Sequence, residues 1–177
     1  IRKAFTIGEI MKLCKSYRST FEITDFSQRI QPNHELEPII RHGEPPAILR
    51  FEDIKQEILG IFSIISSFKK SGYTSLGIVC KTETQARELS ESLRVHTGDI
   101  HFLSNQSSAF MKGIIITSSH MAKGLEFDEV IVPYVNDKNY NSAIDKSMLY
   151  VAVTRAMHRL TLTYNGRPSE FIPASIR

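Results

Sequence analysis

Apolar residues recur along the chain at two kinds of spacing, and each kind predicts a different element. Between positions 53 and 70, isoleucine and phenylalanine recur at intervals of three or four, which is the spacing of one helical face. Gly72 lies just beyond, where helices commonly end. Shorter patterns of the same kind predict further helices at 6–14, 19–30, 82–95 and 143–158.

Short runs of apolar and β-branched residues lie between these helices and predict strands. The continuous apolar run 76–80 is typical of a strand that is buried on both faces. The segment 31–46 is rich in proline and charged residues, so we expect a surface loop there. Further strands are predicted at 47–51, 113–117, 129–135 and 160–164. Because strands and helices alternate, the pattern predicts an α/β fold with a mostly parallel central sheet flanked by helices.

The composition fits one globular domain. The chain has 177 residues, of which 41% are apolar and 23% charged. Its net charge of +3, from 22 Lys and Arg against 19 Asp and Glu, is too small to indicate a nucleic-acid partner. Cys14 and Cys80 do not have the spacing of a zinc site or of a disulfide framework. No apolar run is long enough to span a membrane, so we expect a cytoplasmic protein without a membrane partner.

Three stretches carry residues that can perform chemistry, and the first is 117–127. It follows a predicted buried strand, and ligands of open parallel sheets lie beyond the carboxyl ends of strands, where we expect this segment. Gly124 lets the backbone approach a ligand closely, and Glu126 can accept hydrogen bonds from a ribose. A solvated loop with a helix cap explains these residues equally well.

The second stretch is 147–158, at the end of a predicted helix. Arg155 lies away from the apolar stripe that Leu149, Ala152 and Val153 form. A guanidinium group matches phosphate oxygens, and arginine fingers accelerate phosphoryl transfer by roughly 10³–10⁵. An arginine on the surface near a helix C-terminus, where the helix dipole favours a cation, is the alternative interpretation.

The third stretch is 15–20, where Tyr17 and Arg18 stand at a turn between two predicted helices. A tyrosine can stack on a base while an arginine pairs with a phosphate. Taken alone, an ordinary helix junction with a capping serine explains this stretch better.

Other patterns of nucleotide or metal sites are missing. The sequence has no GxxxxGK[ST], so it does not predict a complete ATP site. The acidic pair in 127–129 resembles one that holds magnesium, but it precedes a predicted strand, and we interpret it as a turn. The six histidines have no metal-binding spacing.

In this order, the three stretches resemble conserved motifs of the superfamily 1A helicases, the group that includes UvrD, Rep and PcrA. Residues 16–20 resemble motif IV, 118–127 motif V, and 149–157, with the core Val-Thr-Arg-Ala, motif VI. The resemblance runs from about Tyr17 to Tyr164. It implies that residues 1–177 form a single RecA-like domain, the second motor domain (2A) of a helicase, with the three-layer fold of P-loop NTPases. Ile1 in place of a methionine is what we expect of a domain cut from a longer chain.

The resemblance also implies roles in an ATP site. Tyr17 would stack on the adenine, and Arg18 and Arg155 would reach the γ-phosphate as catalytic residues. Glu126 would bind the ribose, and Gly124 would let its loop pass close to the nucleotide.

The same motifs imply a contact with single-stranded nucleic acid, DNA or RNA. Ser118, His120 and Lys123 would lie on the side of motif V that faces the strand. Ser118 replaces the usual threonine of the family and keeps the hydroxyl group.

The missing motifs imply a partner domain. In this family the phosphate-binding loop and the ligands of Mg²⁺ belong to a first RecA-like domain, which would precede Ile1, and ATP binds between the two domains. Only about 97 residues separate Thr20 from Ser118, too few for the large 2B insertion of UvrD. The compact form also resembles the helicase IV and HelD-like branch, whose HelD members free RNA polymerase from nucleic acid.

Three functions are therefore weighed. The first is half of a DNA helicase ATPase that is inactive in isolation, and the second is a HelD-like module with RNA polymerase as partner. The third is a RecA-like module that binds a protein and no longer meets ATP. A free-standing nucleotide-binding protein is disfavoured, because the phosphate-binding loop is missing.

Overall fold

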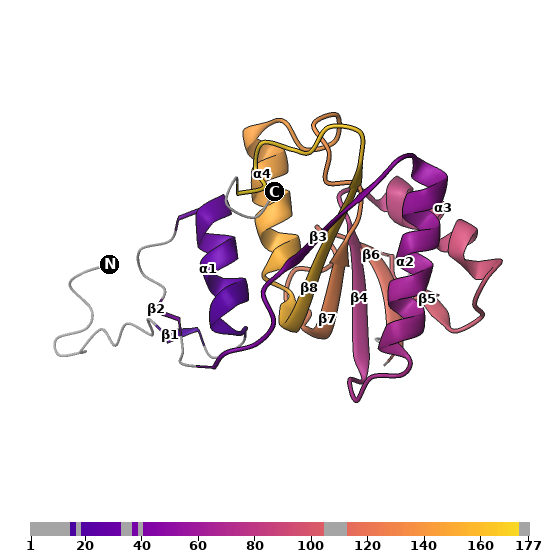
Figure 1. Ribbon diagram of the computed structural model, residues 1–177, viewed down its shortest axis with the longest axis horizontal. Helices are drawn as coiled ribbons and strands as arrows, with labels where there is room; N and C mark the ends of the chain where they lie inside the picture. Colours follow the sequence, from indigo (N-terminus) through magenta and orange to yellow (C-terminus); the bar gives the residue numbers. More distant parts are fainter. Residues whose placement is uncertain (1–14, 17–18, 33–36, 39–40, 105–112, 174–177) are drawn as a thin grey trace, which may run out of the picture.

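The computed structural model describes residues 15–16, 19–32, 37–38, 41–104 and 113–173, and a six-stranded parallel sheet lies at its centre (Figure 1). The order in the sheet is β3-β8-β7-β4-β6-β5. Two further strands of two residues, β1 (Lys15–Ser16) and β2 (Glu37–Pro38), pair with one another. The six strands of the sheet are β3 (Ala47–Phe51), β4 (Ser75–Cys80), β5 (Ile100–Phe102), β6 (Gly113–Ser118), β7 (Phe127–Val132) and β8 (Ala156–Asn165).

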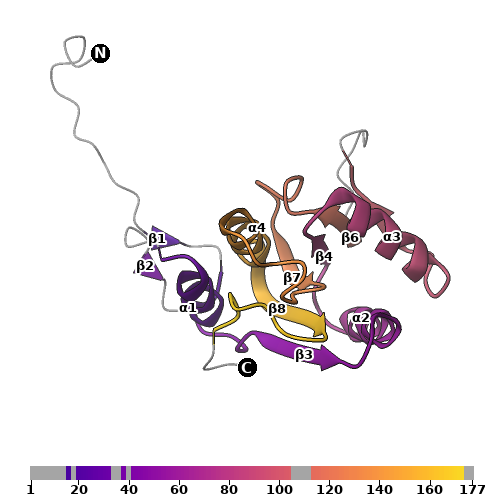
Figure 2. The same ribbon diagram turned by 90° about the horizontal axis from the view of Figure 1, so that it is seen from above.

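Helices cover both faces of the sheet, so the predicted three-layer α/β fold is confirmed. Figure 2 shows α1 (Phe21–Ile30) and α4 (Ala143–Val153) on one face and α2 (Ile54–Phe68) and α3 (Glu83–Arg94) on the other. Thr82 and Ser142 form capping boxes at the starts of α3 and α4, which satisfy backbone N–H groups of the first turn. None of the described helices is long and apolar enough to cross a lipid bilayer.

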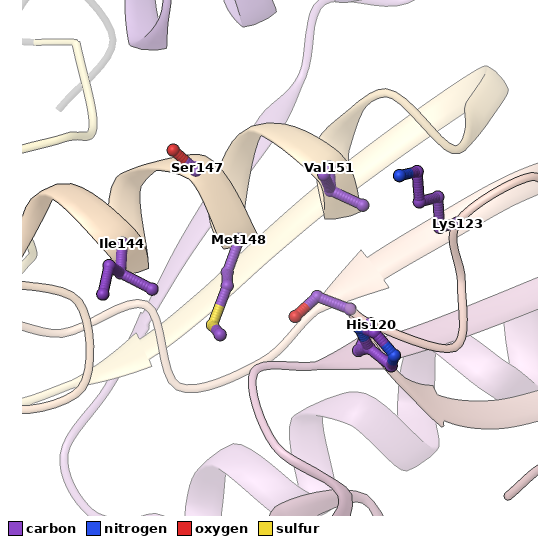
Figure 3. Close-up of a pocket in the computed structure, with 7 residues that line it drawn as sticks. His120, Lys123, Ile144, Ser147, Met148 and Val151 are labelled. Atoms are coloured by element: carbon purple, nitrogen blue, oxygen red, sulfur yellow. The ribbon is translucent and has the colours of Figure 1, made fainter. Parts of the chain in front are cut away.

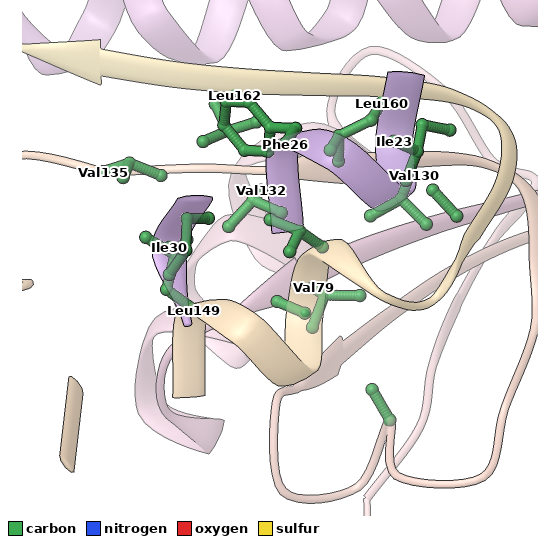
Figure 4. Packing of buried hydrophobic residues seen from close by; sticks show 14 of the residues in the cluster. Ile23, Phe26, Ile30, Val79, Val130, Val132, Val135, Leu149, Leu160 and Leu162 are labelled. Atoms are coloured by element: carbon green, nitrogen blue, oxygen red, sulfur yellow. The ribbon is translucent and has the colours of Figure 1, made fainter. Parts of the chain in front are cut away.

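The core consists of two apolar layers separated by the sheet. In the layer shown in Figure 4, α1 and α4 pack on β7 and β8, and the fully buried side chains include Ile23, Phe26, Leu149 and Leu162. Each such burial contributes about 1.5–3 kcal/mol to folding. The opposite layer joins α2 and α3 to β4 and β6. Both faces of the central strands are therefore buried, as their continuous apolar sequence predicts.

A glycine in the central strand β4 makes room for an aromatic ring. A Cβ built on Gly77 would lie 2.4 Å from the ring of Phe127, closer than real Cβ atoms approach. Phe127 is fully buried and begins β7, so its ring fixes the point at which the chain enters that strand.

A buried carboxylate joins α2 to the ends of two strands. Glu57 is 0% exposed, although it lies on a helix whose neighbouring polar residues face solvent. Its carboxylate accepts hydrogen bonds from the backbone N–H of Tyr134 at 2.9 Å, from Oγ1 of Thr163 at 2.6 Å and from Nδ2 of Asn165 at 2.6 Å. These donors compensate for the loss of water around the charge.

Several predicted boundaries are wrong, and hydrogen bonds explain why. The predicted helix 143–158 ends at Val153, and residues 156–158 belong to β8. The apolar spacing does continue through Ala156. However, the carbonyl of Arg155 accepts a hydrogen bond from the N–H of Phe127, and Ala156 pairs with Phe127 in the sheet.

Other differences concern short elements. The interpretation of 127–129 as a turn is wrong, because these residues lie in β7 and Asp128 accepts hydrogen bonds from the backbone and hydroxyl groups of Thr74 and Ser75. The three-residue strand β5 was too short to give a periodic signal. Thr20 is the residue before α1, but its side chain does not cap the helix. The predicted helix 6–14 lies outside the described residues.

The start of α4 is anchored by an ion pair at the carboxyl end of β4. Lys81 Nζ lies 2.5 Å from Oδ1 of Asp145 and also donates to the carbonyl of Asn139. Burial of Asp145 would raise its pKa. The hydrogen bonds from Lys81, from Ser142 and from the backbone N–H groups of Asn141 and Ser142 outweigh this effect and lower the pKa to about 2.

This lowered pKa predicts an acid-sensitive contribution to stability. Because the folded-state pKa lies below the ordinary value of 3.8, the ion pair stabilises the fold above about pH 4, and this contribution is lost as the pH falls towards about 2. Asp145→Asn should lower the free energy of urea unfolding at neutral pH and flatten its decline over this interval. Asp25→Asn, at a carboxyl that is 41% exposed, is the control and should leave the decline unchanged. An unaltered pH profile in Asp145→Asn would contradict the assignment.

Candidate functional site

The guanidinium of Arg155 is held in the connection between α4 and β8. Nε donates to the carbonyl of Val151 at 3.0 Å, Nη2 to Oγ1 of Thr154 at 3.1 Å and Nη1 to the carbonyl of Leu125 at 3.3 Å. The last bond joins two of the helicase-like stretches, 149–157 and 118–127. The side chain therefore has a defined position beside Glu126, the next residue after Leu125.

The segment 119–126 runs from the carboxyl ends of the strands to their amino ends. At its start, Ser118 pairs with Cys80 at the carboxyl ends of β6 and β4, and at its end Phe127 pairs with Ala156 at the amino ends of β7 and β8. A strand of six residues spans about 20 Å. The expectation that the whole segment lies beyond the carboxyl ends is therefore wrong. Because β6 and β7 are parallel, the chain must return along the length of a strand before β7 can begin.

Gly124 is the point in this segment where the backbone requires a glycine. Its φ is +91°, in the left-handed region that side chains disfavour, and no atom lies within 4 Å of a Cβ built there. Ala122 is fully buried and anchors the segment to the core on the α1 and α4 side. Gly124 and Glu126 are exposed near Arg155. These observations place Gly124, Glu126 and Arg155, three of the predicted nucleotide-site residues, near the amino ends of β7 and β8.

Ser19 and Thr20, the described residues that follow Arg18 in the motif IV-like stretch, contact the amino end of β8. Oγ of Ser19 donates to the carbonyl of Ala156 at 2.6 Å, and the N–H of Thr20 donates to the carbonyl of Met157 at 3.2 Å. Ser19 follows Arg18 in the sequence, and Ala156 follows Arg155. Tyr17 and Arg18 themselves lie outside the described residues.

The predicted strand-binding residues lie elsewhere along the segment. Ser118 is only 5% exposed, and its Oγ accepts a hydrogen bond from the N–H of Met121 at 3.4 Å. His120 and Lys123 are exposed. His120 and Lys123 both line one side of a groove. Val151, whose carbonyl accepts the hydrogen bond from Arg155 Nε, lines the same groove, so the groove adjoins the position of Arg155.

This groove lies between segment 119–126 and helix α4 (Figure 3). Its volume is about 190 Å³, and its lining residues are Ser119, His120, Lys123, Ile144, Ser147, Met148 and Val151. Sequence reasoning missed the α4 residues, although a second apolar stripe on that helix could have revealed them. Within the described ranges, no group of three or more His, Cys, Asp or Glu side chains can hold a metal ion.

The parallel sheet with helices on both faces is the architecture of RecA-like domains. Arg155 joins two of the three helicase-like stretches. Residues 99–167 match the model of the family described as UvrD-like helicase C-terminal domain. The C-terminal domain of a possible DNA helicase from Lactobacillus plantarum WCFS1 has the same fold, with a TM-score of 0.77 and 27% identity, over 91% of this chain and 96% of that domain.

The other comparisons add little. Arterivirus nonstructural protein 10, a helicase solved in complex with DNA, matches with a TM-score of 0.46 and 14% identity over 75% of this chain and 32% of its own, a similarity too low to indicate function. No curated protein matches the chain. The family match over residues 99–167 and the Lactobacillus structure together confirm the resemblance to UvrD-like helicase C-terminal domains.

Proposed function

We propose that this chain is the second motor domain of an ATP-dependent DNA helicase or translocase and supplies one half of an ATP site. A first RecA-like domain would supply the other half. The observation that carries the proposal is the hydrogen bond from Arg155 to the carbonyl of Leu125, because it holds a cation beside Glu126 at a single edge of the sheet. ATP-dependent helicase activity is what the family implies for proteins that contain such a domain.

The chemistry of this edge fits a nucleoside triphosphate. Arg155, joined by Arg18, would stabilise the negative charge that builds up on the transferred phosphoryl group. Glu126 would accept hydrogen bonds from the ribose, Gly124 would give the backbone room, and Tyr17 would stack on the adenine. Bound Mg²⁺ would neutralise phosphate charge, and we expect its ligands on the first domain.

Arg155 also offers a physical link between nucleotide and segment 119–126. Phosphate oxygens are stronger acceptors than a backbone carbonyl, because they carry a full negative charge. When a triphosphate is present, the guanidinium would exchange Leu125 for the phosphate. Release of the carbonyl would loosen the carboxyl-terminal end of segment 119–126. Near its other end the segment carries His120, which would face the DNA strand.

Single-stranded DNA is the nucleic acid we propose for that side. His120 and Lys123 are exposed and can meet phosphates, whereas the buried Ser118 would act by shaping the segment through Met121. The Lactobacillus protein of similar fold is a possible DNA helicase, which favours DNA over RNA. We further propose that residues 1–177 form one domain of a cytoplasmic protein. The HelD-like role at RNA polymerase rests on the short spacing between motifs IV and V and on the Ser-Tyr-Arg-Ser-Thr sequence of residues 16–20.

The half-site predicts that the isolated chain does not hydrolyse ATP. Steady-state phosphate release should be at background for these 177 residues alone, with and without single-stranded DNA. The same assay on the protein that joins this domain to a first RecA-like domain should show hydrolysis that single strands stimulate. Rapid hydrolysis by the isolated chain would contradict the proposal.

A further inference from the structure

Helix α4 presents apolar side chains on two faces, and only one of them is buried. Leu149, Ala152 and Val153 pack into the core and are fully buried. On the other side, Ile144, Met148 and Val151 follow one another at spacings of four and three residues and line the groove. Ile144 is 69% exposed. A helix on the surface of a domain ordinarily has one apolar stripe, so the second stripe indicates a ligand.

The opposite wall of the groove is polar and cationic. Segment 119–126 contributes Ser119, His120 and Lys123, and the seven lining residues include no carboxylate. In Figure 3, Ile144 and Met148 extend from α4 on the side of the helix that faces His120, and Lys123 stands at the end near Val151. The groove therefore combines an apolar wall from α4 with a polar wall that carries the positive charge of Lys123.

We propose that this groove seats one unpaired nucleotide of a DNA single strand, with the base against the α4 stripe and the phosphate at Lys123 and His120. The inference rests on the proposed function and extends it to residues of α4 that the helicase motifs do not include among strand contacts. The thioether of Met148 makes favourable contacts with aromatic rings, and every base offers such a face. The ammonium group of Lys123 pairs with a phosphate as a point charge.

Size and charge favour a nucleotide over a protein segment. The stripe from Ile144 to Val151 extends about 10 Å along the helix axis, and the groove holds only about 190 Å³. Stable protein interfaces involve about 20–30 residues on each side, which is far larger. Because the α4 side chains would contact the face of a base and not its edges, binding should tolerate any sequence.

The test compares two DNA probes, a short oligodeoxythymidylate and an oligomer of the same length made of abasic units. Their affinities for this chain are measured by fluorescence anisotropy at low salt. Ile144→Gln and Met148→Gln should each weaken binding of the oligodeoxythymidylate about five- to tenfold and leave the abasic probe nearly unaffected. Lys123→Ala should weaken both probes and reduce the salt dependence of binding by about one phosphate contact.

Leu59→Gln is the matched control. Leu59 is 54% exposed on α2, which covers the other face of the sheet. Leu59→Gln therefore removes an exposed apolar side chain of the same kind from a place that does not line the groove. This variant should bind both probes as the unmodified chain does. Ile144→Gln changes a side chain that is largely in solvent, and its thermal unfolding should match that of the control, which separates lost binding from lost folding.

The outcomes distinguish the groove from the proposed function. If Lys123→Ala weakens binding but neither α4 variant does, strand binding stands and the base seat is wrong. The proposed base contact would also be overturned if Met148→Gln weakened binding of both probes equally. The same holds if Leu59→Gln weakened binding of the oligodeoxythymidylate as much as the α4 variants do. If the unmodified chain binds neither probe at low salt, the groove proposal fails, whereas the ATP half-site is judged separately by hydrolysis in the two-domain protein.

Discussion

Arg155→Ala should lower ATP turnover by the protein that joins this domain to a first RecA-like domain by about a hundredfold or more. The guanidinium would be lost from the point where the proposal places developing phosphate charge. The measurement is kcat and KM for ATP in the presence of saturating single-stranded DNA. Because the arginine acts on the transition state, most of the loss should fall on kcat, with a smaller change in KM.

Two further variants separate this role from a structural one. Arg155→Lys keeps the positive charge but loses the planar donor geometry, so it should remain strongly impaired while recovering part of the rate. Arg50→Ala removes an exposed arginine from β3, where it pairs with Tyr164 near the carboxyl end of β8, away from the amino end that follows Arg155, and should leave turnover unchanged. If Arg155→Ala turned over ATP at the unmodified rate, Arg155 would not be a finger. Equal thermal stability of the variants would show that lost folding is not the cause.

Glu57→Ala should lower the free energy of unfolding by about 3–5 kcal/mol. Three donors from Tyr134, Thr163 and Asn165 would lose their common acceptor in the interior, and a cavity would replace the carboxylate. Urea unfolding of the isolated chain gives the free energy directly. The loss should be among the largest for any single substitution, because both strand ends depend on this group.

The conservative variant and a control sharpen this prediction. Glu57→Gln keeps one acceptor oxygen but turns an amide N–H₂ towards groups that donate, so we expect a loss of about 1–3 kcal/mol. Glu91→Ala removes an exposed carboxylate from α3 and should change stability by less than about 0.5 kcal/mol. A loss below about 1 kcal/mol in Glu57→Ala would mean that water or other groups replace the acceptor.

Local sequence signals predicted much of the fold. The strand 47–51 was predicted with its exact bounds, and the helix predicted at 82–95 begins with Thr82 as its cap, with Gln85 completing the capping box. These features depend on residues close together in the chain. The burial of Glu57 was not predicted, because a glutamate in an amphipathic helix ordinarily faces water and its partners are 77 or more positions away.

At the candidate site, too, features that depend on residues close together in the chain were predicted, and features that depend on distant residues were not. The motifs identified Arg155, Glu126 and Gly124, and Gly124 indeed has the backbone angle that calls for glycine. Sequence could not show that Arg155 is bonded to Leu125, since a backbone carbonyl leaves no mark in the residue type. Nor did the motifs show that segment 119–126 runs from the carboxyl ends of the strands to their amino ends, which follows because β6 and β7 both pair parallel with β4. The roles of all the predicted site residues remain predictions, and Tyr17 and Arg18 also lie outside the described residues.

The close approach of Gly77 and Phe127 has a consequence for how related sequences diverge. The ring occupies the volume that a side chain at position 77 would need, so the two positions form one packing unit in an interior without spare space. A larger residue at 77 requires a smaller one at 127, and we therefore expect these positions to covary among homologues. Since Phe127 directly follows Glu126, loss of the ring would also loosen the backbone that carries this carboxylate.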